Sequence, residues 1–67
     1  MNIESADRRI LMAIGGDKVT LKEICNRLGA PCAAVTWRVV DLREREFIEF
    51  DKGKFSLPLS VQRQLIH

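Results

Sequence analysis

Residues that commonly do chemistry are few in this sequence, and their spacing does not suit catalysis. The 67 residues hold two cysteines, Cys25 and Cys32, and one histidine, the terminal His67. None of the serines has a convincing base partner to activate its hydroxyl: Ser5, Ser56 and Ser60. We therefore expect that the protein is not an enzyme and that it holds no cofactor and no small-molecule substrate.

The two cysteines are too few for the usual structural roles of this residue. A structural zinc site needs about four Cys or His ligands, and a disulfide scaffold of this size normally has four or more cysteines. We therefore expect no metal site and reduced thiols at Cys25 and Cys32, with Cys25 in the core. Cys32 lies at a predicted helix start, where the helix dipole favours a thiolate. Redox control at Cys32 is the alternative.

Composition is typical of a small globular protein with one domain. Hydrophobic residues make up 46% and charged residues 30% of the chain, and the formal net charge is +2. This charge permits nucleic-acid binding without arguing for it. No apolar run approaches the roughly 20 residues that span a bilayer, and no charged-then-apolar leader opens the sequence. We expect a single domain over residues 1–67, in the cytoplasm and away from membranes.

Three segments have the apolar spacing of amphipathic helices and end at helix-stop residues. Thr20 and Glu23 form a capping box at the start of the second segment. Gly29 provides a left-handed cap at its end, and Pro31 fits the first turn of the third segment. We predict helices over about residues 4–14, 21–28 and 31–46.

After the third helix the apolar period changes from helical to alternating. Ile48, Phe50, Phe55 and Leu57 flank the sequence DKGK, in which Gly53 is the hairpin signal. We predict strands at about residues 47–50 and 54–57, residues 19–20 as candidates for a third strand, and a short helix in the tail, residues 58–67. The fold class is therefore α+β and mostly α.

Three helices followed by a hairpin is the element order of a winged helix-turn-helix. Over about residues 5–57 the chain resembles the small winged helix-turn-helix transcription regulators of bacteria and phages. The resemblance is carried by TLKEICNRLGAP, the pattern of the second helix and turn, and by VTWRVVDLREREFIEF, which leads into the wing. Many members have glycine before the apolar pair Phe47–Ile48. Glu46 stands there in this chain, so we expect a slightly longer third helix.

The resemblance implies a winged helix-turn-helix with a two- to three-stranded wing, whose third helix reads DNA through its N-terminal half. The matching positions are Cys32, Ala33, Thr36, Trp37 and Arg38. Only Arg38 can make a bidentate contact to guanine, whereas Thr36 and the small apolar residues suit thymine methyls or phosphate. Three arginines and three acidic residues cancel over this helix, which is a poor match to a polyanion.

Trp37 has three interpretations at this point. The side chain packs at the rim of the core, or it contacts a sugar or methyl group of DNA. In the third interpretation it forms with Val40 an apolar patch that is buried against another chain, because exposed tryptophans are enriched at interface hot spots.

Cations outside the third helix are a clearer indication of phosphate binding than the balanced charges within it. Lys52 and Lys54 flank Gly53 at the tip of the wing, where they suit phosphate or the minor groove. The alternative is that these lysines only keep a hairpin edge solvated. Lys22 and Arg27 of the second helix face phosphates, or they are ordinary surface residues.

These features predict a small DNA-binding transcription regulator, such as a repressor, that binds double-stranded DNA as a homodimer. The candidate dimer contact is the tail, through Val61, Leu65 and Ile66, with the first helix as the other candidate. The alternative function is a winged-helix module that docks on another protein through Trp37 and Val40.

Overall fold

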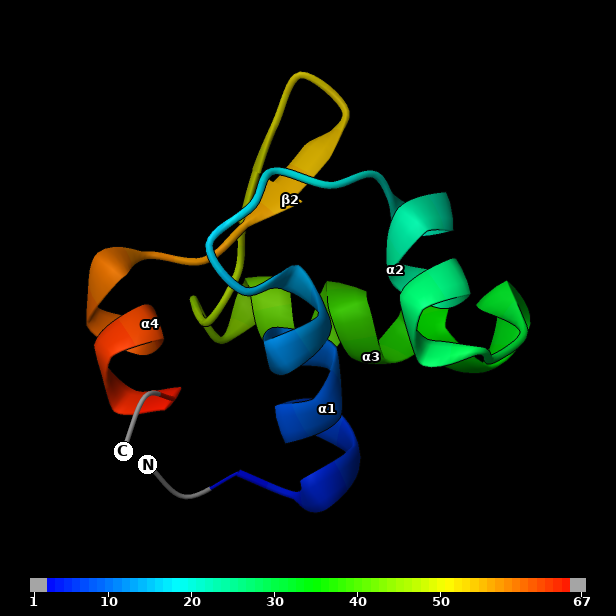
Figure 1. Cartoon of the computed structure of the whole chain (residues 1–67), viewed down its shortest axis with the longest axis horizontal. Helices are drawn as coiled ribbons and strands as arrows, with labels where there is room; N and C mark the ends of the chain where they lie inside the picture. Colours follow the sequence, from blue (N-terminus) through cyan, green and yellow to red (C-terminus); the bar gives the residue numbers. More distant parts are fainter. Residues whose placement is uncertain (1–2, 66–67) are drawn as a thin grey trace.

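Four helices and one β-hairpin make up residues 3–65, which are the residues that the computed structural model describes (Figure 1). The helices are α1 (Ser5–Ile14), α2 (Leu21–Leu28), α3 (Cys32–Glu44) and α4 (Leu59–Leu65), and the strands are β1 (Glu49–Asp51) and β2 (Lys54–Ser56). The predicted α+β class with mostly helical content is confirmed. No helix in this part of the chain is long and apolar enough to cross a membrane.

One buried cluster of apolar side chains joins the helices to the base of the hairpin. Its members are Ile10, Leu11, Ile14, Val19, Ile24, Cys25, Val35, Val39, Leu42, Ile48, Leu57 and Val61. The predicted inward face of the third helix is confirmed, because Val35, Val39 and Leu42 are all at most 4% exposed. Burying one such side chain contributes about 1.5–3 kcal/mol. A core of this size therefore stabilises the fold only modestly.

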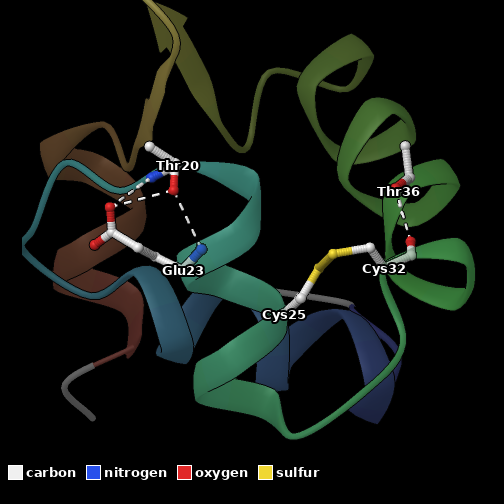
Figure 2. The surroundings of a disulfide bond; sticks show 5 residues. All are labelled: Thr20, Glu23, Cys25, Cys32 and Thr36. Carbon is white, nitrogen blue, oxygen red and sulfur yellow. Dashed lines mark hydrogen bonds between the residues drawn. A yellow bond between two sulfur atoms is a disulfide. The ribbon is translucent and has the colours of Figure 1, made fainter.

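The second helix begins and ends as its sequence predicts. The Oγ1 atom of Thr20 accepts from the backbone N–H of Glu23 at 3.2 Å, and the carboxylate of Glu23 accepts from the backbone N–H of Thr20 at 3.3 Å (Figure 2). At the other end Gly29 adopts a left-handed conformation, with φ 66°. The N–H groups of Gly29 and Ala30 donate to Asn26 and Cys25, which closes the helix with a Schellman motif.

The hairpin is shorter than predicted and turns tightly. Its register pairs Glu49 with Ser56, Phe50 with Phe55 and Asp51 with Lys54. The two turn residues, Lys52 and Gly53, both have positive φ, 51° and 80°. Two such residues form a type I′ turn, whose twist matches that of the strands.

The candidate third strand is reduced to one bridging pair, Val19 with Phe55. The N–H of Val19 donates to the carbonyl of Phe55 at 2.9 Å, and the N–H of Phe55 donates back at 2.6 Å. Figure 1 shows the α1–α2 segment, in cyan, crossing β2. The bridge fastens the hairpin to the residue that precedes Thr20, the N-cap of α2.

The third helix ends before the hairpin and is shorter than predicted. It begins at Cys32, with Pro31 as its N-cap, and ends at Glu44. Glu46 has φ 66°, the left-handed conformation that glycine adopts most easily. The N–H of Glu46 donates to Arg43 and that of Phe47 donates to Leu42, so α3 ends in the same Schellman motif as α2. The local bonds therefore impose the glycine conformation on a glutamate.

Replacing Glu46 with glycine should raise the free energy of unfolding by about 1 kcal/mol, because the left-handed conformation carries a steric cost for a residue with a side chain. Urea unfolding should show a higher midpoint with an unchanged slope. Gly29→Ala is the matched control, since Gly29 holds the same place in α2 and nothing lies within 4 Å of an added Cβ. The control should destabilise by about 1 kcal/mol. A Glu46→Gly midpoint at or below that of the parent would contradict the argument.

Candidate functional site

The outer face of α3 carries two exposed apolar side chains. Trp37 is 59% exposed and Val40 is 48% exposed, while Ala33 and Thr36 are also exposed. The interpretation of Trp37 as a core-rim residue is therefore wrong, because most of its surface faces solvent. The remaining interpretations, contact with DNA or with another protein, both stay predictions.

Arg38, the predicted guanine reader, points back to α1 instead of outward. Its Nη1 atom lies 3.2 Å from Oδ1 of Asp7 and 3.7 Å from a carboxylate oxygen of Glu4. Its guanidinium carbon lies 4.5 Å from the centroid of the Trp37 ring. In this arrangement Arg38 has carboxylate partners within the chain, and reaching a base would require it to leave them.

Asp7 is the polar residue that sequence analysis missed. It is 5% exposed, and its second oxygen accepts from Arg45 at 3.0 Å. Buried carboxylates need close cationic or hydrogen-bonding partners, and Asp7 has two arginines, Arg38 from α3 and Arg45 from its C-cap. The signal that could have found it is its place within the apolar stripe of α1, four residues after Ile3 and three before Ile10.

Two further reading candidates at the start of α3 are also bonded within the chain. The hydroxyl of Thr36 donates to the carbonyl of Cys32 at 2.7 Å (Figure 2). Cys32 itself forms a disulfide with Cys25. The expectation of reduced thiols is therefore wrong. The helix–turn–helix geometry brings the two Cα atoms to 5.5 Å, which is the usual separation for a disulfide.

The predicted DNA-binding cations of the hairpin are exposed, whereas the two predicted cations of α2 differ in their contacts. Lys52, Gly53 and Lys54 are exposed at the hairpin tip, and Lys22 is exposed in the first turn of α2. Arg27 instead donates to the carbonyl of Ala13 at 2.8 Å and to the carboxylate of Asp17 at 3.1 Å. Its guanidinium therefore ties α2 to the end of α1 and the loop after it, so the structure gives Arg27 a local role.

The tail differs from the predicted dimer contact. Val61 is 5% exposed and belongs to the core of its own chain, so it is not available to a partner. Leu65 is half-buried against the same core. Ile66, like His67, lies outside the described residues.

Apolar and acidic side chains lie together where α3 meets the wing. Phe50 is 41% exposed, and the guanidinium of Arg43 lies 5.1 Å from the centre of its ring. Glu46, Glu49 and Asp51 line the same region, and the carboxylates of Asp41 and Glu44 are exposed along the C-terminal half of α3. The C-terminal half of α3 is therefore a poor surface for phosphate, and it suits a partner that is not a polyanion.

Comparisons with known proteins do not add a relative. No protein-family profile, no curated protein and no solved structure matches this chain. The functional argument therefore depends on the geometry of the chain itself.

Replacing Asp7 with asparagine should lower the free energy of unfolding by about 2 kcal/mol, because two arginines lose a buried anionic partner. The loss of stability should be smaller than the loss from breaking a fully buried ion pair, because the Arg38 and Arg45 side chains are 28% and 41% exposed. Chemical denaturation at pH 7 measures it. Asp41→Asn is the matched control, because Asp41 also contacts Arg45 at 3.0 Å but is 50% exposed. It should cost less than about 0.5 kcal/mol. The ion pairs of Asp7 with Arg38 and Arg45 are here called the clamp. Equal losses in the two variants would contradict a stabilising role for the clamp.

Proposed function

We propose that the chain is a small winged-helix regulator that binds double-stranded DNA. The arrangement of α1, α2, α3 and the hairpin, with Val19 paired to Phe55, supports a winged helix-turn-helix. The expected cytoplasmic location and homodimer belong to the same proposal. With Val61 buried, α1 remains as the other candidate dimer face, and Met12 is 59% exposed there.

The observation that carries the proposal is the join between the hairpin and the start of α2. Val19 immediately precedes Thr20, and Phe55 immediately follows Lys54, so the antiparallel bridge sets Lys54 opposite Thr20. Lys22 lies in the first turn of α2, whose N-terminus carries the positive end of the helix dipole. Lys52 and Lys54 at the hairpin tip add two charges. Together, Lys22, Lys52 and Lys54, here called the lysine surface, suit the phosphate backbone.

The proposal assigns α3 a smaller share of sequence recognition than the resemblance implies. Arg38 is engaged by Asp7, and the Thr36 hydroxyl is engaged by Cys32. What remains outward in the N-terminal half is apolar: Ala33, the methyl group of Thr36, and the Trp37 ring. Such groups suit thymine methyls and sugars. We therefore expect binding dominated by the backbone, with modest discrimination between sequences.

Lys52→Ala and Lys54→Ala should each weaken binding to all duplexes by a similar factor, because phosphate contacts carry no sequence information. Each should also reduce the slope of log affinity against log salt by about 0.9. Fluorescence anisotropy with labelled duplexes of mixed sequence, over a salt series, measures both. Arg63→Ala is the charge-matched control, since Arg63 is an exposed cation on α4. The proposal would be wrong if Arg63→Ala lost as much DNA affinity as the two lysine variants. It would also be wrong if the folded protein did not bind DNA at low salt.

A second candidate function is supported by the exposed Trp37 and Val40 together with the acidic surroundings of Phe50. Under this alternative the winged helix docks on another protein, and α3 is the docking face. Exposed apolar side chains near the centre of a patch are typical of binding hot spots. The two candidates differ in what Trp37 contacts, so one substitution separates them.

Trp37→Ala should leave the free energy of unfolding within about 0.5 kcal/mol of the parent, because the side chain is largely exposed. If α3 docks on a protein, immobilised Trp37→Ala domain loses a partner that the parent domain retains, and its DNA affinity is unchanged. If α3 meets DNA, anisotropy shows weaker DNA binding instead. Leu59→Ala is the control of similar exposure, since Leu59 is 66% exposed and Trp37 is 59% exposed. Unfolding of the Trp37→Ala variant would contradict the exposed placement on which both candidates depend.

A further inference from the structure

The disulfide crosses the turn between α2 and α3 and joins two sulfurs in unlike surroundings. Cys25 is 4% exposed, inside the apolar core, whereas Cys32 is an exposed residue at the first position of α3. Figure 2 shows the bond running from α2 to the start of α3. A reagent in solution therefore meets Cys32 first. The chain has no other cysteine, so no other disulfide pairing competes within it.

The start of α3 favours a free sulfur anion at Cys32. Its N-cap, Pro31, provides no side-chain hydrogen bond, and the first turn contains no acidic residue. The backbone N–H groups at this end carry partial positive charge that nothing in the first turn neutralises. A thiolate released at this position is therefore stabilised.

We propose that Cys25 and Cys32 are a reversible thiol–disulfide site, exchanging with low-molecular-weight thiols of the glutathione class, and that its oxidation state sets DNA affinity. The part on DNA affinity rests on the proposed function. In the proposed cytoplasmic location, which is reducing, proteins use disulfides chiefly for catalysis or sensing. Residues 3–65 contain no histidine that could serve as a catalytic base beside the pair, so sensing is the use that fits.

The exchange balances in two steps. A thiolate attacks the exposed Cys32 sulfur, the Cys25–Cys32 bond breaks, and Cys25 leaves with the electron pair and takes a proton from water. A second thiolate attacks the outer sulfur of the mixed disulfide, releasing the oxidised small molecule and leaving Cys32 as a thiolate. Two small thiols are thus oxidised to one disulfide as the protein disulfide is reduced to two thiols.

Reduction loosens the part of the fold that the proposal places nearest the bases. The disulfide covalently fixes the start of α3, which carries Ala33, Thr36 and Trp37, to the buried face of α2. Without it, Cys25 stays in the core as a small apolar side chain, and the fold is retained. The turn at Gly29 then has more freedom, and an anionic sulfur faces the phosphates. Both changes weaken DNA binding.

The first measurement equilibrates the whole chain with a series of reduced and oxidised glutathione mixtures. Iodoacetamide then traps free thiols for counting by mass spectrometry. We expect the pair to change from oxidised to reduced within the series, with a thermal midpoint about 10 °C lower when reduced. A chain that stays fully oxidised, or fully reduced, across the series would overturn the proposal. In single-cysteine variants, Cys32 in Cys25→Ala should react with iodoacetamide about tenfold or more faster than Cys25 in Cys32→Ala. Equal rates would overturn the assignment of Cys32 as the attacked sulfur.

The second measurement is DNA anisotropy with the labelled duplex pool at the two ends of the series. Reduction should weaken the parent by about threefold or more, since a loosened α3 is only partly in its binding arrangement. Cys32→Ala should bind equally in both buffers. Equal affinity of the oxidised and reduced parent would overturn the control of DNA binding. Absence of binding in both buffers would overturn the proposed function itself, and the thiol counts would still decide whether the pair is reversible.

Discussion

Moving a carboxylate out of water costs more free energy than this small core easily offsets, so Asp7 must be held by close cations. One cation, Arg38, comes from α3 and the other, Arg45, is the C-cap of that helix; they stand seven residues apart, close to two helical turns. Arg38 and Arg45 therefore lie along one side of the helix, and α1 holds that side. The rotation of α3 about its axis follows from this clamp. With that side turned to α1 and Val39 turned to the core, Trp37 and Val40 are left facing solvent.

The same clamp decides which chemistry α3 can offer a partner. An arginine that neutralises a buried carboxylate is not free to read a base, and the acidic residues of the C-terminal half then dominate the exposed charge. Three exposed lysines lie instead at the hairpin tip and at the start of α2, which the Val19–Phe55 pair brings together. Electrostatic attraction and apolar contact are thus separated between two parts of the fold. The two proposed functions, DNA binding and protein docking, therefore depend on different parts of the same chain.

Features set by neighbouring residues were predictable from the sequence, and features set across the fold were not. The capping box at Thr20, the left-handed Gly29 and the inward face of α3 each depend on residues within a few positions of one another. The clamp on Asp7 and the disulfide join residues of different helices, and no local pattern specifies such partners. The contacts of Arg27 were not predictable for the same reason, since its partners, Ala13 and Asp17, precede its own helix. Glu46 shows the opposite case, in which hydrogen bonds at a helix end override the preference of the residue itself.

The bridge at Phe55 also leaves the hairpin with a single open side. β2 is paired with β1 on one side and with Val19 on the other, so the unpaired backbone groups belong to β1. That strand is three residues long, and its exposed Phe50 stands between two carboxylates, Glu49 and Asp51. A strand from another molecule that paired with β1 would have to lie beside both carboxylates. Short length and flanking charge are the usual protections of an open sheet edge against aggregation. The acidic residues on either side of Phe50 thereby also disfavour association of copies of the chain through their hairpins.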